Sequence, residues 1–413
     1  MNRRSFLTQA SLLSLGLLLP GASGWAFSNG NPDPKAKRLV VVLLRGAVDG
    51  LNVVIPYGDS RYYQVRHSIA IARPGQDAGA LDLDGRFGLH PSLMPLMPFW
   101  QQGSLGFVHA AGSPDPTRSH FDAQDYMESG APGNKVISTG WMNRLLAQMP
   151  ENHSPIRALN FGPTMPRIFS GPAPVANIEV SARSGKKSAL DRPAVAQAFQ
   201  ELYNDPKDPI SKAFQEGMDA KRTISQDLEE EMVMANGGAP LPNNIPSFGK
   251  QLAKLMTKDP SVQLAFLAFG GWDTHVNQGA GRGQLANRLK PLGQGLADLA
   301  NGLGPLFDNT TIMLMSEFGR TARENGNGGT DHGHGNAIWV LGGKVHGQKV
   351  YGKFNGLGSS DLYEARDVPV LTDFRSVVAS VLEQHMGLAS AGISKVFPQF
   401  SPSLSGIDGI LKA

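Results

Sequence analysis

The sequence lacks cysteine altogether, which excludes disulfides, thiolate nucleophiles and zinc fingers. Charge is also scarce, because only 18% of the 413 residues are Asp, Glu, Lys or Arg and the formal net charge is +3. The basic residues are scattered along the chain and form no dense cluster. We therefore expect no nucleic-acid partner.

Three sequence signatures of common enzyme classes are missing as well. The chain contains no GxxxxGK(S/T) phosphate loop, no GxGxxG between a strand and a helix, and no GxSxG nucleophile elbow. These absences argue against an ATPase, a nicotinamide-dependent enzyme and an α/β-hydrolase.

The chain is rich in apolar residues (41%), in glycine (49 residues) and in proline (29 residues). This composition is typical of a globular protein with many loops rather than of a helical bundle or a disordered chain.

The N-terminus has the pattern of an export signal. Arg3 and Arg4 precede an apolar stretch at 10–20, and small residues then lead to Ala26. We interpret residues 1–26 as a twin-arginine signal peptide followed by a polar leader at 27–37. The alternative is a membrane anchor, but the apolar stretch is too short to span a bilayer stably. The signal predicts a periplasmic or extracellular mature protein with no stable membrane span, whose partner during export is the twin-arginine translocase.

The remaining chain alternates apolar strands with helical segments. Continuous apolar runs are typical of strands covered on both faces, and leucines at three- and four-residue steps predict an amphipathic helix at 283–307. This alternation predicts an α/β fold with a mostly parallel central sheet and helices on both faces, formed by residues 38–413 with a peripheral insertion near 160–245. Strands are expected at 38–44, 104–111, 262–269, 310–315 and 336–341, and helices at 91–101, 120–128, 139–148, 193–203, 208–234, 248–257, 283–307 and 374–386.

Polar clusters follow these strands where ligands bind in such sheets, beyond the carboxyl ends. Carboxylates and imidazoles that converge there would suit a divalent metal such as zinc, manganese, calcium or magnesium. The glycine-rich loop at 326–335 would bring further ligands close. The candidate residues are Asp49, the 119–122 cluster with Ser119 and His120, Asp273, His275, Glu317, Arg320, Asp331, His332 and His334.

Structural roles compete with these functional ones. Asp49 alone could be a turn or cap residue, and Ser119 could be the N-cap of the next helix, with Asp122 at N3. Three arginines near this edge, Arg45, Arg118 and Arg320, could clamp an oxyanion or form structural salt bridges. His90 stays undecided, and the histidines expected in core or surface positions are His67, His109, His153, His346 and His385.

Several long motifs carry a resemblance to a known family. LVVVLLRGAVDGLNVVIPYGDSRYY, GLHPSLMPL, SPDPTRSHFDAQDYMESG, GGWDTHVNQ and SEFGRTARENGNGGTDHGHGNAIWVLGG occur in this order. Over roughly residues 38–390 the chain resembles the bacterial family called domain of unknown function 1501. That family is similar to the alkaline phosphatase-like superfamily of phosphatases, arylsulfatases, phosphonate hydrolases and cofactor-independent phosphoglycerate mutases. The resemblance implies a three-layer alkaline phosphatase-like fold with metal beyond the carboxyl edge of the sheet.

The resemblance also implies roles for individual residues. Ser119 would be the nucleophile at a helix start, with Thr117 as second choice, and His120 and Arg320 would complete the catalytic group. Two departures stand out: Glu317-Phe318 replaces the superfamily's Asp-His pair, and no formylglycine can form at Pro114–Arg118 because cysteine is absent. The implied metal ligands are Asp49, Asp273, His275, Glu317, Asp331, His332 and His334.

These observations predict an extracytoplasmic, metal-dependent hydrolase or transferase acting on a phosphate or sulfate ester, on a small molecule or a glycan. The alternative is a non-catalytic binding or assembly protein that retains the fold, which the loss of one imidazole favours. Metal content and the effect of Ser119→Ala on ester turnover distinguish the two.

Overall fold

The computed structural model describes residues 35–150, 154, 156–178, 235–244 and 247–412. The predicted signal peptide and the predicted helices at 193–203 and 208–234 lie outside these residues. So does most of the predicted insertion, although its first part, near 158–178, contributes two strands to the sheet described below. Within the described residues, no helix has the length and apolar character needed to cross a membrane.

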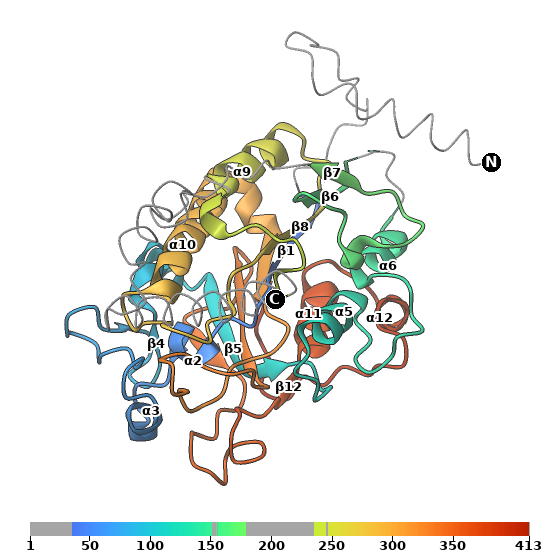
Figure 1. The fold of residues 1–413 in the computed structure, drawn as a ribbon. Helices are drawn as coiled ribbons and strands as arrows, with labels where there is room; N and C mark the ends of the chain where they lie inside the picture. Colours follow the sequence, from blue (N-terminus) through green and yellow to red (C-terminus); the bar gives the residue numbers. More distant parts are fainter. Residues whose placement is uncertain (1–34, 151–153, 155, 179–234, 245–246, 413) are drawn as a thin grey trace, which may run out of the picture. The chain divides into compact units, whose positions relative to one another are not determined.

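A nine-stranded sheet forms the centre of the fold (Figure 1). Its strands run in the order β11-β5-β10-β9-β1-β8-β6-β7, and β12 pairs with β5. Their bounds are β1 Arg38–Leu44, β5 Leu105–Gly112, β6 Ala158–Phe161, β7 Ala176–Ile178, β8 Leu264–Phe269, β9 Thr310–Met315, β10 Asn336–Gly342, β11 Lys349–Tyr351 and β12 Thr372–Asp373. Every pairing is parallel except those of β10, which is antiparallel to β5 and β9. The sheet is therefore mostly parallel, as predicted.

Side chains of the central strand β1 alternate between two apolar layers. Val40, Val42 and Leu44 pack on one face with side chains of α9 (Phe248–Lys258) and α10 (Gln284–Gly302). Leu39, Val41 and Leu43 pack on the other face with α6 (Trp141–Gln148), α11 (Phe374–Gln384) and α12 (Ser390–Val396). Because successive strand residues point to opposite faces, a continuous apolar run is what a sheet buried on both sides requires. The protein is thus a three-layer α/β structure, with the two helix layers visible on either side of the sheet in Figure 1.

Two predicted helices differ in type or length from the observed ones because of proline and glycine. The segment predicted as a helix at 91–101 begins as the 3-10 helix η1 (Pro91–Leu96) and continues as α4 (Met97–Gln101), because its prolines cannot donate backbone hydrogen bonds. The helix predicted at 283–307 ends earlier, since Gly304 has a φ of +52° and a short 3-10 helix η5 (Gly304–Asn309) follows.

Smaller elements complete the described chain. The short helices α2 (Gly50–Val53) and α3 (Ser60–Val65) follow β1, and β2 (Val54–Ile55), β3 (Leu81–Asp82) and β4 (Gly88–Leu89) form a separate three-stranded sheet. The helix that positions the site is α5 (His120–Ser129). Two 3-10 helices remain, η2 (Arg167–Phe169) and η4 (Pro242–Asn244).

Candidate metal centre

Four segments that are distant in sequence meet at one edge of the central sheet. Asp273 and His275 follow the end of β8, Glu317 follows the end of β9, and His120 is the first residue of α5. His332 precedes β10, and because β10 is antiparallel to β9, its start lies at the edge where β9 ends. The strand directions therefore gather the predicted residues at the edge where ligands bind in such sheets.

Two glycines allow the backbones to approach closely there. Gly46 has a φ of +110°, and a Cβ at this position would lie 2.7 Å from the backbone nitrogen of Asp273. A Cβ on Gly333 would lie 2.4 Å from the backbone of Arg320, which forms an antiparallel β-bridge with the backbone of His332. Side chains at either position would push apart the segments that carry Asp273, Glu317 and His332.

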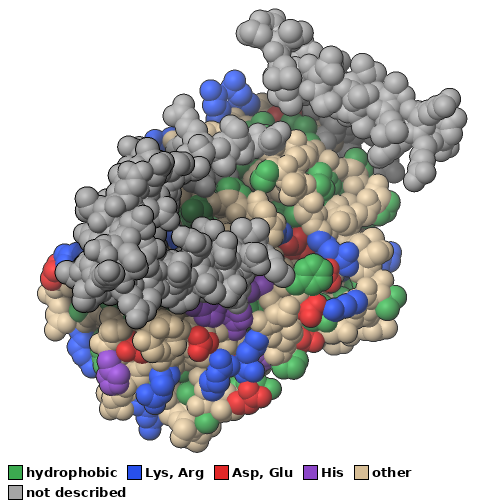
Figure 2. Space-filling model, viewed as in Figure 1, with side chains coloured by type: hydrophobic (Ala, Val, Ile, Leu, Met, Phe, Trp, Pro, Cys, Tyr) green, Lys and Arg blue, Asp and Glu red, His purple; other side chains and the backbone are tan. Residues whose placement is uncertain are grey.

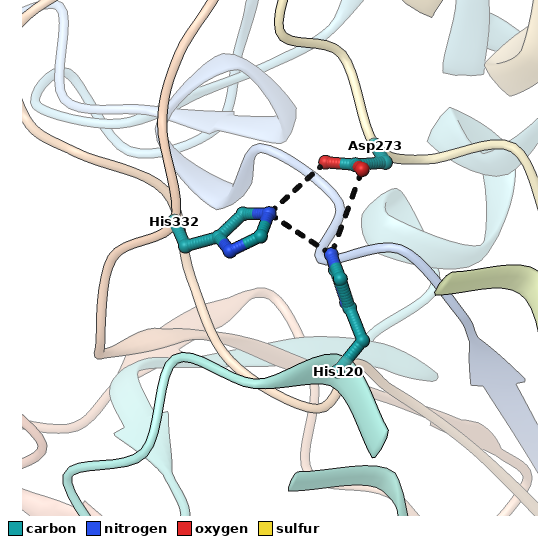
Figure 3. A group of neighbouring side chains, drawn as sticks. All are labelled: His120, Asp273 and His332. Atoms are coloured by element: carbon teal, nitrogen blue, oxygen red, sulfur yellow. Dashed lines mark hydrogen bonds and ion pairs between the residues drawn. The ribbon is translucent and has the colours of Figure 1, made fainter. Parts of the chain in front are cut away.

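Three imidazole nitrogens converge at the centre of the group. The Nε2 atom of His332 lies 3.0 Å from Nε2 of His120 and 3.0 Å from Nε2 of His275. Asp273 closes the group: its Oδ1 is 3.0 Å from Nε2 of His275 and 3.4 Å from Nε2 of His332. Figure 3 shows His120, Asp273 and His332 pointing toward one another from three different segments.

The opposite nitrogen of each ring faces an oxygen atom. Nδ1 of His120 lies 2.8 Å from Oε1 of Glu317, and Nδ1 of His332 lies 2.9 Å from the carbonyl oxygen of Arg118. Nδ1 of His275 lies at the longer distance of 3.4 Å from Oδ1 of Asp331. A carbonyl or carboxylate oxygen only accepts hydrogen bonds, so these contacts favour a proton on Nδ1 and direct the Nε2 lone pairs to the centre. This is how proteins hold metal-binding histidines.

Asp273 brings negative charge into the centre. Its side chain is 1% exposed, and Oδ1 accepts a hydrogen bond from the buried guanidinium of Arg320. Although burial opposes its ionisation, the neighbouring histidines and Arg320 outweigh that effect and hold the pKa of Asp273 far below its usual range. The second oxygen, Oδ2, is buried and accepts no hydrogen bond from any described residue. Nε2 of His120 lies 3.6 Å from this oxygen, beyond hydrogen-bond distance, and a metal ion in this position would satisfy the buried oxygen.

Glu317 positions His120. It is completely buried, and its Oε1 accepts hydrogen bonds from Nδ1 of His120, from the Gly46 backbone at 2.7 Å and from Nε2 of Gln124 at 2.9 Å. Its Oε2 accepts one from Ser316 at 3.0 Å. Burial opposes the charged His120 ring, but the carboxylates of Asp273 and Glu317 outweigh it and raise its pKa to about 9. A metal that binds this ring would displace a proton from Nε2. Glu317 therefore lies behind His120, where its oxygens are already occupied.

The donor set fits a transition metal. The donor atoms of His120, Asp273 and His332 all lie within 4.8 Å of one another, and the contacts within the group are 3.0–3.6 Å. Tetrahedral zinc with bonds of about 2.0–2.1 Å holds its ligand atoms about 3.4 Å apart. Three imidazoles and one carboxylate suit zinc or another first-row metal, whereas calcium and magnesium prefer oxygen ligands.

The side chains of His275 and His332 are 19% and 17% exposed, so solvent reaches the group. Histidine side chains, flanked by charged ones, are visible on one face of the molecule in Figure 2.

The structure does not bring Asp49 into this group. Both of its oxygens accept hydrogen bonds from Arg66, at 2.5 and 3.0 Å, and Oδ2 also accepts one from Gln278 at 2.7 Å. Asp49 and Arg66 are fully buried. A cation at Asp49 would have to displace the guanidinium of Arg66, and no sequence pattern indicated that these two residues pair.

Two predicted loop ligands also lie outside the centre. Asp331 contacts the outer nitrogen of His275 and accepts a hydrogen bond from Asn325 at 3.0 Å, and its side chain is 53% exposed. The ring of His334 stacks on Tyr363 with ring centroids 4.9 Å apart, and burial lowers its pKa. Of the three loop candidates, His332 alone points its nitrogen into the group.

The predicted catalytic residues lie partly inside and partly outside the candidate site. His120 belongs to the metal group, by which we mean His120, Asp273, His275 and His332, and Arg320 lies beside this group, bonded to Asp273. Ser119 is exposed at the N-cap of α5, where its hydroxyl accepts from the backbone N–H of Asp122 at 3.5 Å. Thr117 Oγ1 accepts from the backbone N–H of Ser119 at 3.2 Å. Both hydroxyls thus have the structural partners of a helix start.

Sequence reasoning missed the residues that hold these groups in place. Gln124 lies one turn beyond His120 on α5 and reaches Glu317. Gln278 joins Asp49 to Thr274 and Thr330 by hydrogen bonds at 2.7, 2.6 and 3.2 Å. The four-residue spacing of His120 and Gln124 could have indicated a shared helix face. For Gln278 no sequence signal was available.

Three further histidines outside the site are buried. His90, which stayed undecided from the sequence, and His109, which was expected in a core or surface position, have ring nitrogens bonded to backbone groups, and burial lowers the pKa of each to about 4. His385 is also buried, with its pKa lowered to about 4. His153 lies outside the described residues.

Comparison with known proteins places the chain in a family. The family model described as "Protein of unknown function (DUF1501)" matches residues 36–397. No curated protein matches the chain. Among solved structures, a sulfatase from Pseudoalteromonas sp. is similar with 13% identity and a TM-score of 0.40, over 92% of this chain and 73% of that one. The C-terminal periplasmic domain of EptC from Escherichia coli is similar with 11% identity and a TM-score of 0.37, over 89% and 88% of the two chains. Likeness at this level carries no argument about activity.

Proposed function

The chain belongs to the DUF1501 family, and we propose that it is an extracytoplasmic, metal-dependent hydrolase or transferase acting on phosphate or sulfate esters. One observation carries the proposal. Three imidazole Nε2 atoms and a carboxylate oxygen of Asp273 that accepts no hydrogen bond from a described residue converge at the carboxyl edge of the sheet, with the outer ring nitrogens facing oxygen acceptors.

The proposed metal ligands are His120, Asp273, His275 and His332. A divalent metal held by them would supply Lewis-acid polarisation of a phosphoryl or sulfuryl oxygen. Zinc suits these ligands better than manganese, calcium or magnesium, which prefer oxygen ligands. Glu317 fixes the ring of His120, and Arg320 fixes the carboxylate of Asp273.

Ser119 is the proposed nucleophile because its hydroxyl is exposed next to His120 at the start of α5. Its Oγ would bond to phosphorus or sulfur while the ester oxygen leaves with the hydroxyl proton as an alcohol. Water would then release inorganic phosphate or sulfate from the serine, or a second alcohol would accept the group in a transferase. The predicted signal at 1–26 supports a periplasmic or extracellular site of action.

The hydrogen bond that Ser119 accepts as a helix cap favours the second candidate, a binding protein that keeps the metal group without turnover. The two candidates share the metal and differ in the role of the serine. In the hydrolase, Ser119→Ala abolishes ester turnover while leaving bound metal unchanged. In the binding protein, no ester is turned over by either form.

The first experiment is elemental analysis of the exported protein, purified without chelator, followed by a screen of aryl phosphates and sulfates. We expect about one equivalent of metal, lost in His275→Asn, whose partly exposed ring makes misfolding of the variant less of a concern than for Asp273→Asn. Asp77→Asn, an exposed aspartate paired with Arg282, is the control and should keep the metal. Wild-type protein that holds no metal and takes none up on titration would overturn the proposal.

A further inference from the structure

The three arginines predicted as oxyanion clamps are all engaged in the structure. Arg45 pairs with Glu128 at 2.6 Å, and Arg118 pairs with Asp367 and Glu364, each at 2.7 Å. Arg320 bonds to Asp273 and to the carbonyl oxygens of Ala47, Gly46 and Thr330 at 2.7, 2.8 and 3.0 Å. Each guanidinium therefore already neutralises a carboxylate, and none of the three is left to neutralise a substrate.

A fourth arginine near the centre is differently placed. Arg288 lies in the first turns of α10, and among the described residues its one hydrogen bond is from Nη1 to Oε1 of Gln284, one turn earlier, at 3.0 Å. A Cβ on Gly271 would lie 3.2 Å from Nε and 3.5 Å from Cζ of Arg288. Gly271 precedes Asp273 by two residues, so the guanidinium lies over the backbone that carries this metal-group carboxylate.

Arg288 is a half-buried cation without a carboxylate partner within salt-bridge distance among the described residues. Burial lowers its pKa to about 10; the charge of Asp273 opposes this effect and that of Arg320 adds to it. The side chain stays charged at neutral pH. Partly burying a cation without a counter-charge is unfavourable, and an anion beside it would offset that cost.

We propose that Arg288 binds the oxyanion of the substrate beside the metal group and so restricts the site to anionic tetrahedral esters. The inference rests on the proposed function and deepens it. A guanidinium presents parallel N–H donors that match two oxygens of a phosphate or sulfate. Within the described part of the chain, Arg288 uses one donor, in its hydrogen bond to Gln284. Glycine at position 271 lets the guanidinium of Arg288 lie close to the backbone there, because any side chain at this position would contact both Arg288 and Leu241.

The test measures binding of inorganic phosphate and sulfate to zinc-loaded protein by calorimetry, for wild type, Arg288→Gln and Arg288→Lys. Arg282→Gln is the matched control, since it also removes one arginine near the start of α10 but from a side chain that is 75% exposed and paired with Asp77. Zinc content is measured for every protein. We expect Arg288→Gln to weaken anion binding by about 10–100-fold, the effect of losing charge-assisted hydrogen bonds, with zinc content unchanged.

Arg288→Lys should recover part of the affinity, because it keeps the charge but not the paired donors. If an ester is turned over, the loss in Arg288→Gln should appear in KM more than in kcat. Equal anion affinity in Arg288→Gln and wild type, both loaded with zinc, would overturn the role of Arg288 and leave the metal site standing. Failure of the wild type to bind zinc would instead overturn the proposed function.

Discussion

Replacing Glu317 with glutamine tests whether the metal group depends on the residue behind it. Four donors surround the Glu317 carboxylate: Nδ1 of His120, the Gly46 backbone, Gln124 and Ser316. Glutamine keeps one acceptor oxygen for the first three, and its amide nitrogen can donate to Ser316 Oγ. The variant should therefore fold, whereas alanine would remove the acceptor of two buried donors, His120 Nδ1 and the Gly46 backbone N–H.

The expected defect lies in metal affinity. Without the negative charge, Nδ1 of His120 has a weaker acceptor, so the ring is less firmly oriented and its Nε2 is a poorer ligand. Losing such a partner typically weakens metal binding by about 10–100-fold, or about 1.4–2.7 kcal/mol. The pKa of His120, raised to about 9 in the wild type, should fall, because one of the carboxylates that raise it is gone.

Zinc affinity is measured by competition with a chelator, together with the thermal midpoint and the His120 titration by NMR. Two results would refute the reasoning. Unchanged zinc affinity would show that the contact with His120 does not prepare the ligand. Complete loss of zinc from a folded Glu317→Gln protein would show that Glu317 is itself a ligand, as the family resemblance implied.

Two further predictions concern stability. Asp49→Ala should lower the free energy of unfolding by about 3–5 kcal/mol, because it leaves the guanidinium of Arg66 buried without its partner. Urea denaturation measures this loss. A loss below about 1 kcal/mol would contradict the stabilising role of the buried Asp49–Arg66 pair. Stability should also fall as the pH drops from about 6.5 toward 4, since the buried His109 ring has its pKa lowered to about 4 from 6.5 and the folded protein favours its neutral form. His109 should account for a loss of about 3 kcal/mol in the free energy of unfolding, which is absent above about pH 6.5 and complete below about pH 4. A smaller pH dependence of stability in His109→Gln than in the wild type would confirm this contribution.

The layers of the fold were predictable because burial on both faces leaves a simple pattern. β1 and β9 begin and end as their apolar runs do, and α11 begins where the sequence placed it. The antiparallel direction of β10 was not predictable, since a run buried on both faces is equally apolar in either direction. Strands β6 and β7 have only four and three residues, too few to show a period.

The site was predictable as a region but not as a ligand set. Ser119 and His120 are sequence neighbours, and the sequence allowed two interpretations: one catalytic cluster, or Ser119 as the N-cap of the next helix. In the structure, Ser119 is the extended N-cap and His120 the first helical residue, so the hydroxyl caps α5 while the imidazole enters the metal group. Which of two neighbouring side chains enters a site depends on where the helix begins, and here it is His120 that contacts Glu317 and His332.

The number of metals follows from the difference between Asp49 and Asp273. Both carboxylates are buried at strand ends and both bond to a buried arginine. Arg66 and Gln278 occupy both oxygens of Asp49, whereas Arg320 occupies one oxygen of Asp273 and leaves Oδ2 facing the imidazoles. A second metal at Asp49 would have to expel a fully buried guanidinium that also bonds to the carbonyl oxygens of Thr321 and Ala322. That guanidinium already supplies the positive charge a second metal would bring, which favours a single-metal site at His120, Asp273, His275 and His332.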